Sequence, residues 1–399
     1  MLGDRLAPEA TIPAATFRPL SSANKTPILL LALVAAIACA VVALPVSTSG
    51  APTPRPVPAF FGIAPQTELT SRDVQYMRAG GIGSVRLPFL WHTIQPTPRR
   101  EYDWSGVDSA IETISRSGLR VLPFLFGTPG WLAGKEQTLP IDSGRARSAW
   151  VAFVKAAVER YGPGGDFWTE RAPGGVGPNY LPVISRPLPI RAWQVWNEAN
   201  FFYFAFPVSP TRYARLLKLT QPAIKSVDSR AEVILSGLFG NPDEGGRRGM
   251  DAPDFLDRLY AVPGIKARFD AIALHPYAFH VDDFEELTEQ IREVAIENRD
   301  PRARLYITEI GWGSQNDPDI VAFEQGIQGQ VRELRSTYRY LLANKGRLNL
   351  KGTYWFSWKD LHGSCNFCDS VGLFRAGAAF RPKPSWRAFV AITGGRMRP

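Results

Sequence analysis

The chain has 399 residues, of which 45% are hydrophobic and 21% charged, which excludes a peptide hormone, a disordered chain and a polytopic membrane protein. Only 3 cysteines are present, which excludes a disulfide-built scaffold. The formal net charge of +9 comes from scattered Lys and Arg residues rather than a long basic run, so we expect no nucleic-acid partner.

The first notable element is an apolar stretch at residues 28–46, which carries no charged side chain. As a helix rising about 1.5 Å per residue, it would span roughly 28 Å, close to the hydrocarbon thickness of a bilayer. Arg5, Arg18 and Lys25 precede it, whereas no basic residue follows before Arg55. This charge bias predicts a cytoplasmic N-terminus.

We therefore expect a single-pass protein of the cell membrane, contacting the membrane through residues 28–46, with the rest of the chain after the apolar stretch outside the cytoplasm. Secretion after cleavage of the apolar stretch is the alternative. The expected organisation is a cytoplasmic segment at 1–25, a transmembrane signal-anchor helix at 26–47, a Pro-rich linker at 48–59 and one large domain at 60–399.

After the linker, short runs rich in Val, Ile, Leu and Phe alternate with longer amphipathic stretches, which predicts strands alternating with helices. The predicted strands are 60–65, 84–89, 120–126, 191–198, 232–239, 270–277, 304–312 and 351–358. The predicted helices are 71–79, 104–117, 143–161, 210–227, 253–260, 283–298, 321–344 and 384–392.

Eight repeats of strand and helix favour an α/β fold of the (β/α)8 TIM-barrel type, because parallel strands need helical crossovers and eight of them can close. An open doubly wound sheet would require a glycine-rich phosphate turn after the first strand, and FGIAPQTEL at 61–69 has none. The Gly- and Pro-rich residues 162–189 are interpreted as a loop inserted on the N-terminal face of the barrel.

Two of the predicted strands end in an acidic residue within an apolar setting. Glu198 closes the fourth strand and Glu309 the seventh. Functional residues of such barrels lie at the C-terminal strand ends, and a buried carboxylate needs a compensating partner or a function. Two carboxylates that flank a cleft can hydrolyse a glycosidic bond, with one as acid and the other as nucleophile or base. An ion pair or helix cap at the barrel rim is the structural alternative for either residue.

The surrounding residues strengthen this interpretation. WNEAN at 196–200 resembles the Trp-Asn-Glu-Pro signature of glycoside hydrolase clan A, and ITEIGW at 307–312 resembles the nucleophile strand of that clan. The resemblance runs from about residue 60 to 389 and is closest to families 39 and 5, which include cellulase- and xylosidase-like retaining β-glycosidases. Ala199 replaces the proline of the signature, which affects only the local turn.

The resemblance implies roles for individual residues. Glu198 is implied as the general acid and base with a raised pKa, and Glu309 as the nucleophile. Arg86 would keep Glu309 ionised and Tyr277 would orient it. Asn197 would hydrogen-bond the 2-hydroxyl of the sugar.

The resemblance also implies supporting residues. His275 would hold the hydrogen-bond network of the site, and Trp355 would form the platform under the sugar. Trp131, Trp312 and Trp358 lie at or after strand ends, where flat aromatic faces suit pyranose rings. Core packing is the alternative for Tyr277 and for each of the tryptophans.

Cys365 and Cys368 follow the eighth strand and are close enough in sequence to form a small disulfide. A zinc site with His362 and Asp369 is an alternative, as are free thiols. We expect no metal and no cofactor in the catalytic reaction.

The sequence therefore predicts a retaining glycoside hydrolase that cleaves β-glycosidic bonds of a poly- or oligosaccharide by two-carboxylate double displacement, with endo action at the cell surface. A glycan-binding protein without turnover, or a transglycosylase, on the same barrel are the alternatives. Sugar and linkage specificity and oligomeric state are not encoded in these motifs.

Overall fold

The computed structural model describes residues 57–99, 101–175, 177–178, 181–242, 245–316, 323–363 and 367–399. The predicted cytoplasmic segment, the predicted anchor helix and most of the predicted linker lie outside these residues. Among the helices of the described part, none combines the length and apolar character needed to cross a membrane.

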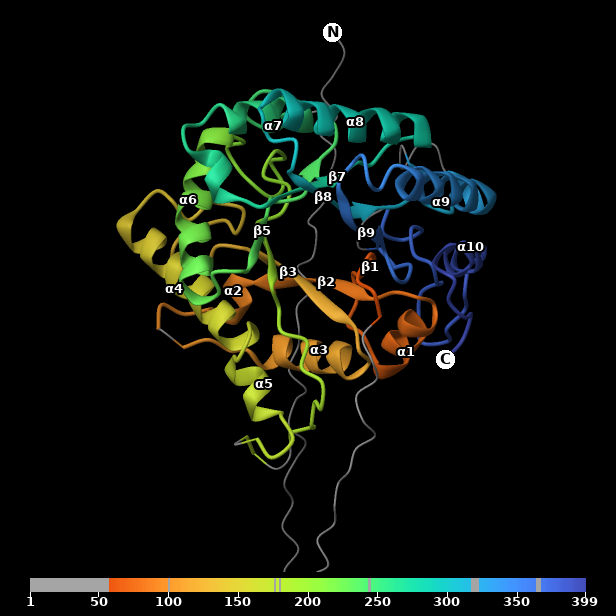
Figure 1. Cartoon of the computed structure of the whole chain (residues 1–399), viewed down its shortest axis with the longest axis horizontal. Coiled ribbons are helices and arrows are strands. Elements are labelled where there is room, and N and C mark those ends of the chain that lie inside the picture. The colour runs from red at the N-terminus through yellow and green to blue at the C-terminus, as the bar shows by residue number, and fades with distance from the viewer. Residues whose placement is uncertain are drawn as a thin grey trace, which may run out of the picture.

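The described strands form one parallel sheet in the order β5-β4-β3-β2-β1-β9-β8-β7-β6, and an additional pairing of β5 with β7 closes it into a barrel (Figure 1). Their bounds are β1 (Phe61–Ala64), β2 (Ser84–Leu90), β3 (Arg120–Phe126), β4 (Ala192–Val195), β5 (Glu232–Ile234), β6 (Leu238–Phe239), β7 (Ala271–His275), β8 (Arg304–Ile310) and β9 (Leu350–Phe356). The predicted barrel is confirmed.

The prediction of one continuous fifth strand at 232–239 is wrong, because β5 and β6 share that position and are separated by residues 235–237. Gly237 has φ +72°, a left-handed conformation that a regular strand does not contain. The barrel therefore has eight strand positions, the fifth of which is split.

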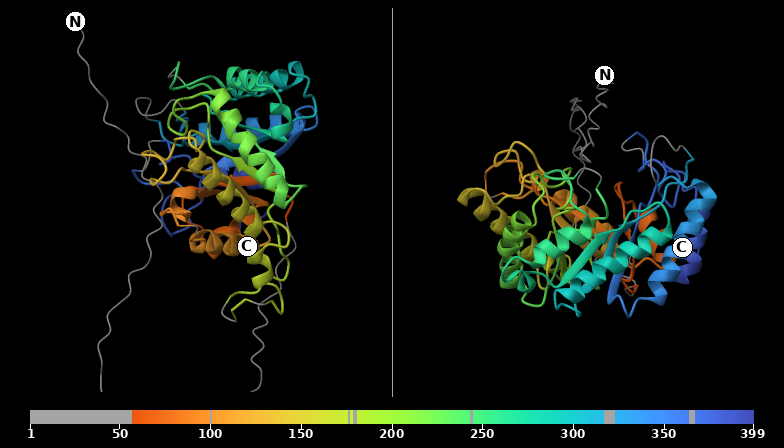
Figure 2. Two further views of the ribbon diagram at one scale, coloured as in Figure 1. Left: turned by 90° about the vertical axis from the view of Figure 1, so that its left-hand side faces the viewer. Right: turned by 90° about the horizontal axis from the view of Figure 1, so that it is seen from above.

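The helices surround the strands, as both views of Figure 2 and the labels of Figure 1 show. They are α1 (Ser71–Ala79), α2 (Trp91–Ile94), α3 (Ser105–Arg116), α4 (Gly144–Tyr161), α5 (Asp166–Glu170), α6 (Pro210–Val227), α7 (Ala252–Tyr260), the 3-10 helix η1 (Ile265–Arg268), α8 (Val281–Glu297), α9 (Gly326–Ala343) and α10 (Pro384–Thr393). The long predicted helices are found, whereas the short α2, α5 and η1 were not predicted. Helix α5 lies within the segment that was interpreted as a loop, and one turn is too short to give a periodic pattern.

Two apolar clusters lie on opposite faces of the strands. The larger cluster joins strand residues such as Ile63, Val85 and Trp355 to residues of the helices. The smaller one contains no helix residue and includes Leu122, Tyr354 and Phe356, so it fills the interior of the barrel. Neighbouring residues of a strand point to opposite faces, and this alternation decides which side chains reach the site.

Candidate active site

Glu198 lies in a turn just after β4. The prediction that the fourth strand reaches residue 198 is wrong, because β4 ends at Val195 and the chain then turns through Trp196 at φ +74° and Glu198 at φ +38°. Left-handed conformations of non-glycine residues are unfavourable and concentrate at functional sites. Hydrogen bonds hold this turn, since the Glu198 N–H donates to the Ser236 carbonyl oxygen at 2.9 Å.

Ala199, which replaces the proline of the clan signature, makes a backbone hydrogen bond that proline could not make. The backbone N–H of Ala199 donates to the Ser236 hydroxyl oxygen at 3.2 Å. Proline has no N–H and could not make this bond. Ser236 therefore holds the turn twice, through its carbonyl and through its side chain.

Glu309 lies in β8, where the pairing with β9 is irregular. The register shifts between Ile307 and Ile310. A β-bulge lets consecutive side chains depart from strict alternation. Thr308 and Glu309 consequently both reach the barrel interior, where they contact His275 and Arg86 respectively.

The two carboxylates meet, as the sequence predicted. One oxygen of Glu198, one of Glu309 and a ring nitrogen of His275 all lie within 4.8 Å of one another. Both acids are nearly inaccessible, with 5% of Glu198 and 8% of Glu309 exposed. His275 Nδ1 lies 2.6 Å from Glu198 Oε1 and 3.8 Å from Glu309 Oε2.

Glu309 is held from two sides. Arg86 of β2 forms a buried ion pair with its Oε1, and the hydroxyl of Tyr277 donates to its Oε2 at 2.8 Å. Arg86 also donates to Asn197 Oδ1 at 2.6 Å and to Gln194 Oε1 at 2.7 Å. The structure thus brings the sequence-predicted Arg86, Asn197, His275 and Tyr277 together around the carboxylates.

The electrostatic environment of the site shifts the pKa values of Glu198, His275 and Tyr277. Burial and the negative charge of Glu309 raise the pKa of Glu198 well above its ordinary value, against a smaller opposing effect of Arg86. Burial and the charge of Arg86 hold the pKa of His275 well below its usual range, so this ring is neutral. Burial and the two carboxylates raise the pKa of Tyr277, which stays a hydrogen-bond donor.

Glu198, His275 and Glu309 are residue types that can bind a cation. Most of their ligand atoms are already engaged, because both nitrogens of His275 are hydrogen-bonded, one of them to Glu198 Oε1, and Glu309 accepts from Arg86 and Tyr277. A cation would also be repelled by the Arg86 guanidinium. We therefore interpret the three side chains as partners of one another and not as a metal centre.

The prediction of Trp355 as the sugar platform is not supported. Trp355 is fully buried in the cluster shared with the helices, and its Nε1 donates to the Val371 carbonyl oxygen at 3.2 Å. The neighbouring Phe356 points into the barrel by strand alternation, and its ring lies 6.1 Å from the ring of Tyr277. The aromatic residue of β9 beside the site is therefore Phe356.

The other predicted tryptophans also have packing roles. Trp358 is fully buried, and its Nε1 donates to Asp73 Oδ1 at 2.6 Å at the start of α1. Trp312 is fully buried as well and donates to the Ala278 carbonyl oxygen at 3.0 Å. Trp131 is partly exposed and is the one of the four that presents some surface to solvent.

Cys368 is disulfide-bonded. Its predicted partner Cys365 lies outside the described residues, so the pairing stays a prediction. A disulfide sulfur is not a thiolate, and this excludes Cys368 from the alternative zinc site.

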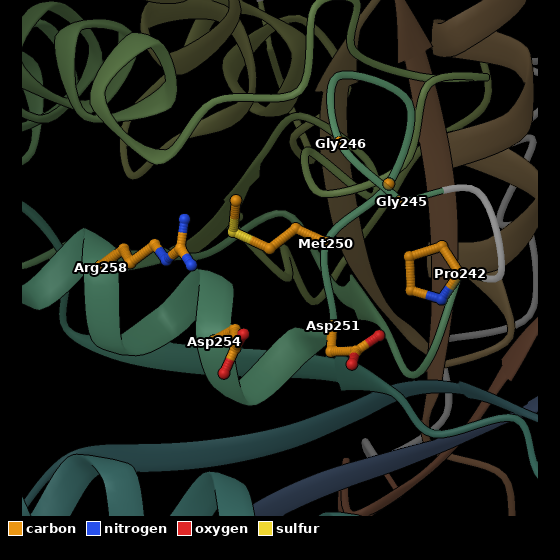
Figure 3. A pocket seen from close by; sticks show the side chains of 8 residues that line it. Pro242, Gly245, Gly246, Met250, Asp251, Asp254 and Arg258 are labelled. Atoms are coloured by element: carbon orange, nitrogen blue, oxygen red, sulfur yellow. The ribbon is translucent and has the colours of Figure 1, made fainter.

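Two surface pockets of the described residues lie away from the carboxylates, and neither is lined by Glu198 or Glu309. One of about 350 Å³ lies where the loop after β6 meets α7, and Figure 3 shows Asp254 and Arg258 on that helix beside it. The backbone carbonyl oxygen of Met250, in the wall of this pocket, accepts a hydrogen bond from the Asn200 side chain at 2.8 Å. Asn200 follows the turn that carries Glu198, so the pocket and the turn are connected through this bond. The other, of about 570 Å³, lies in the segment that follows α2.

The fold of the chain is similar to the folds of several solved glycoside hydrolases. A family 39 glycoside hydrolase from Bacteroides cellulosilyticus matches with a TM-score of 0.59 and 18% identity, covering 84% of this chain and 64% of that one. A monomeric β-xylosidase from Caulobacter crescentus gives 0.59 and 18%, covering 85% and 69%. Xylanase 10B from Thermotoga maritima gives 0.56 and 14%, covering 84% and 95%. At these identities the likeness concerns the fold.

No family model matches the chain. Among curated proteins, a β-xylosidase from Geobacillus stearothermophilus is 28% identical over 156 residues, which are 36% of this chain and 26% of that protein. A β-galactosidase from Thermus thermophilus is 35% identical over 88 residues, which are 20% of this chain and 13% of that protein. The alignments thus span about a quarter or less of these relatives.

Proposed function

We propose that the chain is a retaining glycoside hydrolase that cleaves β-glycosidic bonds by double displacement. The observation that carries the proposal is the approach of Glu198 and Glu309, whose oxygens lie within 4.8 Å. Retaining enzymes need carboxyl groups about 5 Å apart, whereas inverting ones need roughly 6.5–9.5 Å to admit a water molecule. Glu309 is paired with the Arg86 cation, whereas the pKa of Glu198 is raised, and this difference supports the division of roles.

In the first half-reaction Glu309 attacks the anomeric carbon of the sugar. The bond from that carbon to the leaving oxygen breaks, and Glu198 delivers its proton to that oxygen. The raised pKa of Glu198 keeps the proton available. Arg86 and Tyr277 hold Glu309 in place. The product of this step is a glycosyl ester on Glu309.

In the second half-reaction a water molecule attacks the same carbon from the face that the leaving group vacated. Glu198, now ionised, accepts the water proton, and the ester bond to Glu309 breaks. Two inversions give net retention. Asn197 accepts from Arg86 through Oδ1, so its amide N–H groups are the ones oriented to donate to the 2-hydroxyl of the sugar.

The proposal extends to the substrate and its location. The substrate is a poly- or oligosaccharide, cut internally at the cell surface, and the apolar residues 28–46 support the location. Membrane retention is tested by fractionating cells that express the full chain or a chain starting at residue 59. The size distribution of early products distinguishes endo from exo action.

The catalytic roles are tested with a panel of aryl β-glycosides, including xylosides and galactosides. Glu309→Gly should lower hydrolysis by orders of magnitude, and added azide should restore turnover and give the glycosyl azide of inverted configuration. Glu198→Ala with azide should instead give the azide of retained configuration, and only with good leaving groups.

A matched control is Glu289→Gln, which removes the charge of a partly exposed acid on α8 whose recorded partners, Arg347 and Tyr340, do not belong to the candidate site. Its activity should equal that of the unaltered chain. Undiminished hydrolysis by Glu309→Gly would refute the nucleophile. Saccharide binding without turnover by the unaltered chain would favour the glycan-binding alternative.

A further inference from the structure

A buried chain of hydrogen bonds connects the two halves of the candidate site. Arg86 Nε donates to Gln194 Oε1 at 2.7 Å, and Gln194 Nε2 donates to the Thr308 hydroxyl oxygen at 3.2 Å. The Thr308 hydroxyl oxygen lies 2.9 Å from His275 Nε2, and His275 Nδ1 lies 2.6 Å from Glu198 Oε1. The interpretation of the sequence did not identify Gln194 or Thr308.

The direction of the first bonds follows from the chemistry of the groups. A guanidinium only donates, so the amide of Gln194 must turn its oxygen towards Arg86. Its NH2 group therefore faces Thr308, which accepts. The Thr308 O–H group therefore needs an acceptor other than Gln194.

Thr308 is fully buried, and a buried O–H without an acceptor is costly. Among the described residues the only other hydrogen-bond partner recorded for this hydroxyl is His275 Nε2. The hydroxyl therefore donates to Nε2, and Nε2 carries no proton. Because the ring is neutral, its single N–H must be at Nδ1, which donates to Glu198 Oε1.

We propose that Gln194 and Thr308 are positioning residues that fix the Nδ1–H tautomer of His275 and thereby confine the transferable proton of Glu198 to Oε2. Oε1 is occupied as an acceptor from His275 in both protonation states of Glu198. The proton that reaches the leaving group therefore always starts from the same oxygen. This assignment of the proton's use rests on the proposed function, whereas the tautomer itself does not.

Close packing keeps the imidazole in place. A Cβ atom built on Gly237 would lie 2.2 Å from His275 Nε2. The backbone between β5 and β6 therefore packs closely against the edge of the ring that faces Thr308. A flip of the ring about Cβ–Cγ, which exchanges Nδ1 with Cδ2 and Nε2 with Cε1, would break the hydrogen bonds to both Glu198 and Thr308. The split of the fifth strand thus serves the same hydrogen-bond chain.

The tautomer is tested directly by two-bond proton–nitrogen NMR of the full chain labelled at histidine nitrogen, near neutral pH. The chain has 4 histidines, and loss of a signal set in His275→Asn assigns the ring. We expect a protonated Nδ1 and an unprotonated Nε2. A protonated Nε2 in the unaltered chain would overturn the proposal even if hydrolysis is confirmed.

The catalytic consequence is tested with Thr308→Val, which keeps the shape but removes the hydroxyl, and with Thr308→Ser, which keeps the hydroxyl. A poor leaving group needs the proton of Glu198, whereas dinitrophenolate leaves without it. For Thr308→Val we expect kcat/KM to fall about tenfold for a poor leaving group and less than about twofold for a dinitrophenyl glycoside.

Thr308→Ser should restore most of the loss with the poor leaving group. Equal losses on both substrates would indicate a merely structural role and overturn the proposal. If Thr308→Val does not fold, the Thr308→Ser variant and the NMR tautomer still decide. A chain that shows the Nδ1–H tautomer but hydrolyses nothing would refute the proposed function alone.

Discussion

Replacing Arg86 with methionine should destabilise the protein strongly. The guanidinium is only 2% exposed and contacts Glu309, Asn197 and Gln194 together. Removing one partner of a buried ion pair leaves an uncompensated charge and costs about 3–5 kcal/mol. Against a total stability of about 5–15 kcal/mol, this is a large fraction. Urea denaturation of the unaltered chain and of Arg86→Met gives the difference in unfolding free energy.

A double-mutant cycle separates charge from packing. Glu309→Gln alone leaves the Arg86 cation without its counter-ion, so it should also be destabilising. The double variant Arg86→Met with Glu309→Gln buries no charge at this point, and its loss should be clearly smaller than the sum of the single losses. Strict additivity would refute the view that the two groups stabilise each other.

A surface pair serves as the control. Arg347 and Glu289 also form an ion pair, but their side chains are 53% and 30% exposed. Arg347→Met should cost at most about 1 kcal/mol, because solvent screens the exposed pair. A loss as large as that of Arg86→Met would show that burial is not the decisive factor.

Three further predictions concern other parts of the structure. Burial raises the pKa of Glu198 above its ordinary value of 4.5. The unaltered chain should therefore lose stability as pH rises through the folded-state pKa, whereas Glu198→Gln should lack this loss. A difference in unfolding free energy between the two chains that stays constant with pH would contradict this prediction. Gly237→Ala should lower Tm and activity more than Gly264→Ala, because both glycines have positive φ but only at Gly237 would the Cβ meet other atoms; equal effects would argue against the contact. Trp358→Phe should lower the unfolding free energy by about 1–3 kcal/mol, because the hydrogen bond to Asp73 is lost, and should leave kcat/KM unchanged. A lower kcat/KM without destabilisation would instead indicate that Trp358 acts in the candidate site.

Much of the fold could be predicted because its signals are local and repeated. The helix bounds of α1 and α6 match the prediction residue for residue, since each has a side-chain cap before it and a clear apolar periodicity. The break between β5 and β6 could not be predicted in the same way. It depends on a contact between Gly237 and His275, which are distant in sequence.

The residues of the candidate site likewise differ in whether they could be predicted from the sequence. Glu198 and Glu309 stand out because an acid in an apolar run is unusual, and Arg86, His275 and Tyr277 were proposed through the family resemblance. Gln194 and Thr308 are ordinary polar residues whose role depends on three-dimensional hydrogen bonding. The error at Trp355 has a simpler physical origin, because adjacent residues of β9 face opposite sides and the register decides between Trp355 and Phe356.

The gap in the fifth strand makes the barrel wall and the turn that carries Glu198 mechanically interdependent. At this seam only Ile234 and Ala271 pair directly across β5 and β7, while the Ser236 carbonyl and hydroxyl bond to the turn that carries Glu198. Loosening of the seam, by heat or by substitution, would therefore displace Glu198 before the barrel as a whole opens. Thermal inactivation of such a protein would begin at lower temperature than its global unfolding.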